Sequence, residues 1–193
     1  MKDSGAIRTP AVENAFRAID RAQFMPEEFR NEAYRDTALP IGAGQTISQP
    51  TVVAHCLEWL SARPGDRVLD VGSGSGWTTA LLAHLAGPIG SVIGTERIQK
   101  LVSFGSKNLS TYGFTQAHIE QAGHELGKPE AAPFDRILVS AAADEMPNAL
   151  AQQLKDGGIM VIPIQNAICV VDRVGEHFKT VCHKGFVFVP LIT

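Results

Sequence analysis

Short apolar runs of strand length alternate along the chain with longer stretches in which apolar residues recur at helical spacing. The alternation starts at Arg67 and continues to Pro163. Strands separated by helices indicate an α/β fold with a mostly parallel sheet, flanked by helices on both faces. The predicted strands cover 67–71, 91–96, 117–121, 135–140 and 159–163, and the predicted helices cover 78–86, 98–112 and 147–155, the last one stopped by Lys155-Asp-Gly-Gly158.

The pattern changes after Pro163. Two apolar runs, 168–174 and 181–189, are both typical of strands, and Gly175-Glu176-His177 predicts a turn between them. No helix fits between Pro163 and Val189, so we expect the sheet to end in antiparallel strands.

The first part of the chain is less regular. Val12, Phe16 and Ile19 have helical spacing and predict a helix over 12–22, and a short helical turn follows at 27–32. The stretch 33–49 is predicted to be irregular, yet it carries more polar detail than a linker needs. Pro50 is suited to the first position of a helix that runs to residue 60, because a proline there lacks only an N–H that the helix does not use.

The strand at 67–71 is followed by a glycine-rich turn within the run RVLDVGSGSGW. A strand, a glycine turn and a helix form the first crossover of a nucleotide-binding α/β fold. The spacing Asp70-x-Gly72-x-Gly74-x-Gly76 differs from the dinucleotide pattern G-x-G-x-x-G, and no Lys-Ser/Thr pair follows as in a phosphate-binding P-loop. Alternatively, the turn merely joins the strand to the helix.

A second acid, Glu96, ends the next predicted strand. A carboxylate at this position can accept hydrogen bonds from both ribose hydroxyls. Together, the acid, the three alternating glycines and the distal acid resemble the S-adenosylmethionine site of class I methyltransferases. The resemblance implies a Rossmann-like fold and S-adenosyl-L-methionine as the cofactor.

Four further segments narrow the resemblance. They are LPIGAGQTISQP at 39–50, FMPEE at 24–28, APFDR at 132–136 and FVPL at 188–191. With these, nearly the whole chain resembles the protein-L-isoaspartate O-methyltransferase family. The resemblance implies methyl transfer from S-adenosylmethionine to the free α-carboxylate of isoaspartyl residues in damaged proteins and peptides, after which the ester collapses to a succinimide that can reopen to aspartate.

The resemblance also implies roles for individual residues. It places residues 1–50 on the substrate side of a single domain spanning 1–193, and it implies no metal ligands. Ser48 corresponds to the active-site serine, and the segments Ser140–Ala143 and Val189–Leu191 lie at the substrate cleft. The implied cofactor-binding residues are Asp70, Gly72, Ser73, Gly74, Gly76, Glu96, Gly123 and His124, and the implied substrate-binding residues are Gln45, Thr46, Ile47, Ser48, Ala141, Ala142 and Val189.

Simpler roles are open for several of these residues. Ser48 precedes a helix by two residues and could cap it, since serine is a common capping residue. Gln45 and Thr46 could form a turn. Asp70 could accept hydrogen bonds from backbone N–H groups of its own loop rather than contact a ligand, and Trp77 could simply pack the start of its helix.

The chain departs from the family at one place. The loop after the third strand usually reads Gly-Asp-Gly, and its Asp contacts the adenine amino group. Here the matching residues are Ala122-Gly123-His124-Glu125, so the carboxylate at position 123 is absent. His124 or Glu125 could substitute for it, or the backbone alone could hold the base; one lost neutral hydrogen bond is worth roughly 0.5–1.5 kcal/mol.

The implied chemistry needs few groups. A carboxylate has an ordinary pKa of about 4 and is ionised at neutral pH, so it needs no general base. The site has to align oxygen, methyl and sulfur and exclude water, and alignment alone can be worth roughly 7–11 kcal/mol. We therefore expect Ser48 to orient the substrate carboxylate as a hydrogen-bond donor, without a catalytic triad.

Composition adds constraints on partners and location. The 193 residues carry a net charge of −3, so no broad basic surface for nucleic acid is expected. No apolar stretch reaches membrane-spanning length, and MKDSGAIRTP lacks the apolar core of a signal peptide. Three cysteines, far apart in sequence, fit reduced thiols better than disulfides or a metal site. We expect a cytoplasmic monomer.

Two competing functions are compatible with the same motifs. A related methyltransferase could act on another peptide carboxylate, such as an ordinary aspartate. A non-catalytic interaction module could keep the fold without cofactor affinity; the altered loop at 122–125 motivates this idea, whereas the intact glycine run and Glu96 oppose it.

Overall fold

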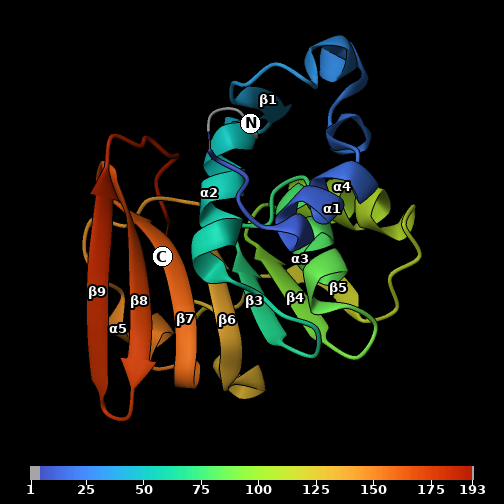
Figure 1. Cartoon of the computed structure of the whole chain (residues 1–193). Coiled ribbons are helices and arrows are strands. Elements are labelled where there is room, and N and C mark those ends of the chain that lie inside the picture. The colour runs from blue at the N-terminus through green and yellow to red at the C-terminus, as the bar shows by residue number, and fades with distance from the viewer. Residues whose placement is uncertain (1–4, 193) are drawn as a thin grey trace.

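A computed structural model describes residues 5–192. Its centre is a seven-stranded sheet in the order β5-β4-β3-β6-β7-β8-β9, which Figure 1 shows from β5 on the right to β9 on the left. Within this sheet, β3 to β7 are parallel to one another, and β8 and β9 are added antiparallel, as predicted. The strands are β3 (Arg67–Val71), β4 (Ser91–Glu96), β5 (Ala117–Gln121), β6 (Phe134–Val139), β7 (Leu154–Ile164), β8 (Ala167–Val174) and β9 (His177–Lys184).

The strand order determines where a ligand can bind. From β3 the chain builds outward through β4 to β5, and then returns to place β6 on the other side of β3. In open α/β sheets, the crevice at such a reversal, outside the carboxyl ends of the strands, is the usual binding site. The glycine turn that follows β3 lies at this point.

Helices cover the two faces unevenly. Helices α1 (Pro10–Ala18), α2 (Pro50–Leu60), α3 (Trp77–Ala86) and α4 (Gln99–Ser110) share one apolar core with one face of the sheet, and α2 crosses in front of it in Figure 1. The opposite face packs against the short α5 (Asn148–Ala151) and neighbouring loops. Helices on both faces were predicted, and this part of the prediction is confirmed.

The predicted helix 147–155 is wrong beyond residue 151. Leu154 already pairs with Phe134 of β6, and an irregularity in register separates this pair from Arg136–Ile159. The residues between them, including Gly157 with a φ of +76°, lie within the long β7 and do not stop a helix. The side chain of Arg173 donates to the carbonyl of Gln152 and to that of Leu154, which fixes this bend from β8.

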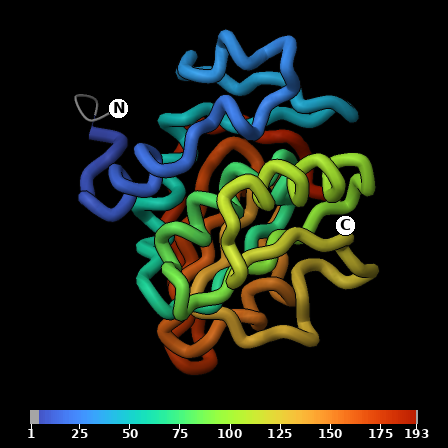
Figure 2. Tube along the Cα trace, turned by 90° about the vertical axis from the view of Figure 1, so that its right-hand side faces the viewer, coloured from blue at the N-terminus to red at the C-terminus, as the bar shows by residue number. Residues whose placement is uncertain are grey.

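The N-terminal segment differs from its prediction in two places. Helix α1 ends at residue 18, because the Asp20 side chain accepts from Ala22 N–H and begins a separate 3₁₀ turn, η1 (Arg21–Phe24). A second turn, η2 (Glu27–Glu32), lies where it was predicted. The stretch 33–49 is not simply irregular, because it contains a hairpin of β1 (Leu39–Gly42) and β2 (Gln45–Ile47). Figure 2 shows η2 and the hairpin, in lighter blue, at one end of the molecule, whereas α1 lies along its side.

The last strand begins earlier than predicted. β9 starts at His177 directly after the tight turn at Gly175, pairs along its length with β8, and ends at Lys184, not at 189. Gly185, with a φ of +100°, then redirects the chain toward the middle of the sheet. There Val189 O accepts from Ala142 N–H and Leu191 N–H donates to Ala142 O, which attaches the C-terminal segment to the loop after β6.

The prediction of three reduced cysteines is also wrong. Cys169 of β8 and Cys182 of β9 are directly paired across the antiparallel ladder, and they form a disulfide. A spacing of 13 residues in sequence gave no hint of this, because the pairing follows from the turn at 175–176. Cys56 is a free, buried thiol on α2. Within residues 5–192, no helix is both long and apolar enough to cross a bilayer.

Candidate active site

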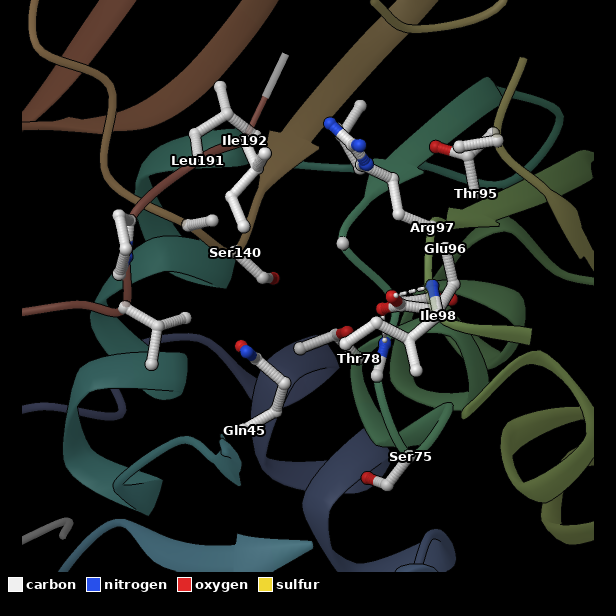
Figure 3. Close-up of a pocket in the computed structure, with 18 of the residues that line it drawn as sticks. Gln45, Ser75, Thr78, Thr95, Glu96, Arg97, Ile98, Ser140, Leu191 and Ile192 are labelled. Carbon is white, nitrogen blue, oxygen red and sulfur yellow. Dashed lines mark hydrogen bonds between the residues drawn. The ribbon is translucent and has the colours of Figure 1, made fainter. Parts of the chain in front are cut away.

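A cavity of about 700 Å³ opens at the carboxyl ends of the central strands. This volume is in the range of small-molecule sites. Figure 3 shows Gln45 and Ser140 on one side of it and Glu96 and Arg97 on the other. Its walls come from Ile41, residues 45–48 of the hairpin, 71–75 with Trp77 and Thr78 after β3, 95–98 after β4, 121–127 after β5, 140–141 after β6, and the C-terminal 189–192.

The glycine turn can form because three of its residues have positive φ. Gly72, Gly74 and Gly76 have φ values of +78°, +53° and +86°, a region that residues with a Cβ rarely adopt. Gly72 and Gly74 line the cavity together with Ser73. Gly76 does not: a Cβ there would lie 2.9 Å from Gly105 O on α4, so Gly76 allows α3 and α4 to pack closely.

Glu96 is held rigidly at the cavity wall. One carboxylate oxygen accepts from Gly74 N–H at 3.0 Å and the other from Ile98 N–H at 2.9 Å, the bonds drawn in Figure 3. The residue is only 7% exposed. A carboxylate has about four acceptor positions, so two remain for a ligand on the cavity side.

Asp70 has a different place from the one predicted. It is fully buried and does not line the cavity. One oxygen accepts from the hydroxyls of Thr78 at 2.8 Å and Thr79 at 2.6 Å, so its partners are threonine side chains rather than backbone N–H groups. Burial raises the pKa of Asp70 to about 6, against the lowering effect of the two threonine hydrogen bonds. Asp70 therefore anchors the start of α3 behind the site.

The hairpin brings its predicted residues to the cavity. Gln45, Thr46, Ile47 and Ser48 all line it. Ser48 does not cap α2, because Gln49 occupies the capping position and makes no side-chain cap.

Asp36 instead accepts hydrogen bonds at the N-terminus of α2. Its carboxylate accepts from Thr51 N–H at 2.9 Å and from the Thr51 hydroxyl at 2.7 Å. The serine hydroxyl therefore has no capping role.

The opposite wall is built after β6 and by the end of the chain. Ser140, Ala141 and Val189 line the cavity, whereas Ala142 only supports it through its two bonds to the C-terminal segment. Pro190, Leu191 and Ile192 continue this wall.

The predicted cofactor-binding residues Gly123 and His124 lie in the loop after β5, on the Glu96 side of the cavity. Gly123 and His124 line the cavity, together with Arg97, Ile98 and Gln121. A Cβ at Gly123 would meet no atom within 4 Å, and a second cavity of about 300 Å³ adjoins the same loop. The space where the family carries a carboxylate is thus open, and the exposed His124 is the neighbouring polar side chain.

Arg21 is a functional candidate that the sequence did not reveal. Its guanidinium is buried, donates to the carbonyl of Ser48, and lies over the ring of Trp77. Nothing in the local pattern distinguishes it from a surface arginine, because its partners are carbonyls far along the chain.

Comparison with known proteins identifies the family of this chain. The model of the family described as protein-L-isoaspartate(D-aspartate) O-methyltransferase (PCMT) matches residues 1–193. The chain belongs to this family. Curated PCMT relatives include the protein-L-isoaspartate O-methyltransferase of Ignicoccus hospitalis, 47% identical over 161 residues (83% of this chain and 76% of the relative), and protein-L-isoaspartate O-methyltransferase 2 of Marinobacter nauticus, 44% identical over 187 residues (94% and 84%).

A solved PCMT structure shares the whole fold. The Plasmodium falciparum protein described as a protein-L-isoaspartate O-methyltransferase, in complex with S-adenosyl-L-homocysteine, superposes with a TM-score of 0.87 at 30% identity, covering 99% of this chain and 94% of its own. The Rossmann-like class I methyltransferase fold expected from the sequence is therefore confirmed.

Proposed function

We propose that this PCMT family member transfers a methyl group from S-adenosyl-L-methionine to the free α-carboxylate of L-isoaspartyl residues in damaged proteins and peptides. The observation that carries the proposal is a single cavity that joins the glycine turn and Glu96 to the hairpin bearing Ser48. A donor held at one end and an acceptor held at the other would meet inside it.

The residues at the donor end fit the proposed cofactor. Glu96 keeps acceptor positions for a ribose diol, and the glycines at 72 and 74 let backbone approach a ligand. Ser73 also lines the cavity, while its hydroxyl is buried against the sheet and has no hydrogen-bond partner among the described residues. Arg97, Ile98, Gly123 and His124 would enclose the base.

The residues at the acceptor end suit a main-chain substrate. An isoaspartyl linkage puts an extra methylene into the backbone and leaves the α-carboxylate as a branch, so recognition has to involve extended main chain. Both walls at this end, the β2 strand and residues 189–192, are extended segments. The small side chain of Ala141 leaves room for the branch between them.

The reaction then requires alignment more than proton transfer. S-adenosylmethionine supplies a methyl group bonded to a positively charged sulfur. A substrate carboxylate oxygen forms the new bond to the methyl carbon while the carbon–sulfur bond breaks and its electron pair goes to sulfur, and no proton moves. The Ser48 hydroxyl donates a hydrogen bond that orients the carboxylate, and the surrounding walls exclude water.

Substitution of the serine tests this mechanism. In Ser48→Ala, kcat for an isoaspartyl peptide should fall about 10- to 100-fold, because a hydrogen bond to a charged group is worth about 1.5–3 kcal/mol. The Kd for S-adenosylhomocysteine, measured by calorimetry, should stay within about twofold. Ser103→Ala on the exposed face of α4 is the matched control and should change neither value. Equal loss of turnover and cofactor affinity in Ser48→Ala would contradict the assignment.

Substrate choice is tested with paired peptides. Methylation of an isoaspartyl peptide, without methylation of the same peptide carrying normal aspartate, supports the proposal. Methylation of the aspartyl peptide alone would favour a related carboxylate methyltransferase. Failure to bind S-adenosylhomocysteine would favour a non-catalytic module, which the opened space at Gly123 makes worth testing.

We further propose that residues 1–193 form a single domain, with 1–50 as its substrate side, that acts as a monomer in the cytoplasm. All segments around the cavity come from one chain, so a partner subunit is not needed to complete it. Residues 1–4 and 193 lie outside the described part. Because the cytoplasm is reducing, this location requires Cys169 and Cys182 to be thiols in cells, and thiol alkylation of protein taken directly from cells tests it; a disulfide found there would contradict the cytoplasmic location.

A further inference from the structure

The side chain of Arg21 makes a set of contacts that the proposed chemistry leaves unused. Arg21 is 4% exposed, and its guanidinium donates to five backbone carbonyls. Three of them, at 2.8–3.3 Å, belong to the segment 33–37 that precedes the hairpin. The other two belong to Ile47, at 3.4 Å, and to Ser48 itself, at 3.0 Å.

Burying this cation is costly. Burial lowers the pKa of Arg21 to about 10, against the raising effect of the Asp36 charge, and within residues 5–192 no carboxylate lies at ion-pair distance from it. The five carbonyl hydrogen bonds offset the cost of burying this charge. Their arrangement matches the rigid, planar set of N–H donors that only arginine provides. The arrangement therefore fixes where these carbonyls lie relative to one another.

Asp36 completes the arrangement from the other side. It sits in the 33–37 segment that Arg21 holds, and it accepts from Thr51 N–H, the Thr51 hydroxyl and, at 3.2 Å, the Gln49 side chain. Partial burial raises the pKa of Asp36, but these hydrogen bonds outweigh that effect and lower it overall. Arg21 thus holds the backbone carbonyl of Ser48, and Asp36 holds Gln49 and Thr51, which follow Ser48 in the chain.

We propose that Arg21 and Asp36 act together as positioning residues that fix Ser48 for methyl transfer. The proposal rests on the function proposed above for Ser48. Neither charged group lines the cavity, so both act through the serine. Arg21 also lies 5.4 Å over the ring of Trp77, which does line the cavity, and this contact ties the position of the serine to the wall of the cofactor end.

The test is a double-mutant cycle between positions 21 and 48. Arg21→Lys keeps the charge and loses the planar set of donors; kcat for an isoaspartyl peptide should fall at least tenfold, with the S-adenosylhomocysteine Kd within about twofold. In the Ser48→Ala chain, Arg21→Lys should lower kcat less than threefold relative to Ser48→Ala alone, because the effects of residues that act through one group are not additive. Arg17→Lys on α1, whose arginine is exposed and paired with Glu13, is the matched control and should have no effect.

A parallel cycle with Asp36→Asn guards against misfolding, because Asp36 is exposed and its substitution leaves the core intact. This variant should lower kcat about threefold in the wild-type chain and leave the Ser48→Ala chain unchanged. The proposal is overturned if Arg21→Lys and Asp36→Asn lower kcat as much in the Ser48→Ala chain as in the wild-type chain. It is also overturned if the S-adenosylhomocysteine Kd rises as much as kcat falls. A Ser48→Ala enzyme with full activity would instead refute the function proposed for the serine.

Discussion

Gly123 leaves open space at the end of the cavity that we propose holds the adenine base. Gly123 has no neighbour within 4 Å of its Cβ position, and its φ lies outside the left-handed region, so a larger side chain fits without strain. In Gly123→Asp, we expect S-adenosylhomocysteine to bind about 2- to 10-fold more tightly, because a carboxylate can accept from the adenine amino group, and at this exposed position water weakens such a bond to about 0.5–1.5 kcal/mol. Calorimetry measures the change.

The control for this variant is chemical. An S-adenosylhomocysteine analogue with two methyl groups on the adenine amino nitrogen cannot donate a hydrogen bond, so Gly123→Asp should not improve its binding. An equal gain for both ligands would mean that the aspartate acts by general charge and not by contacting the amino group.

Single residues also show what the sequence could and could not predict. Glu96 is the last residue of β4 and Gly74 lies in the turn after β3, so their meeting at the cavity is a consequence of local order. Asp70 lies within β3, and its carboxylate accepts from Thr78 and Thr79 in the first turn of α3 rather than facing the cavity. Arg21 and Asp36 were invisible, since their importance depends on contacts between segments that only the folded chain brings together.

At the scale of elements, a stack of rings attaches the outermost strand to a helix. Every residue of β9 except His183 is exposed, and the His183 ring lies flat on Trp59 of α2, with a centroid distance of 4.3 Å. His55 also stacks on Trp59, at a centroid distance of 5.4 Å, and Phe186 makes edge contacts with both Trp59 and His55. These contacts and the disulfide hold β9 to the body.

The stack makes stability depend on pH through His55. Burial, then Arg8 and His183, lower the pKa of His55, while Glu58 raises it. As the pH falls below about 6.5, His55 therefore binds a proton more readily in the unfolded chain than in the folded chain. Protonation then favours the unfolded chain, so the free energy of unfolding decreases as the pH falls from about 6.5. In His55→Phe the ring remains and the titration disappears.

Urea unfolding at pH 7.5 and pH 5.5 measures this effect. Wild-type protein should lose more unfolding free energy between the two pH values than His55→Phe does. His177→Gln, at the exposed start of β9, is the control and should follow the wild type. Parallel pH profiles for wild type and His55→Phe would show that His55 is not the group responsible.

At the scale of the whole molecule, the cavity links segments from both ends of the chain. A ligand that binds only the folded form at 100 times its Kd adds about 2.7 kcal/mol to stability. For a protein of this size that is an increase in Tm of roughly 5–11 °C. We expect S-adenosylhomocysteine to produce this shift in a thermal melt, and NAD at the same concentration to leave Tm unchanged. A Tm that NAD raises equally would contradict a site shaped for the sulfur-containing cofactor.

The architecture was more predictable than its periphery. Central strands such as 67–71 are buried on both faces and are therefore mostly apolar, with Val68 and Leu69 facing opposite sides of the sheet. The hairpin at 39–47 was missed, and the end of α5 and the start of β9 were placed wrongly. Their limits are set by contacts such as Arg173 with the bend in β7 and by tight turns, which leave weak traces in hydrophobic periodicity.

The wall formed by residues 189–192 has a consequence for synthesis. All seven strands of the large sheet are complete at Lys184, before this wall exists. On a translating ribosome, the framework can therefore assemble while one side of the cleft is still missing. A product cut short after the last strand would lack residues 189–192 and leave that side of the cleft open, so the cleft is complete only once these residues have been made.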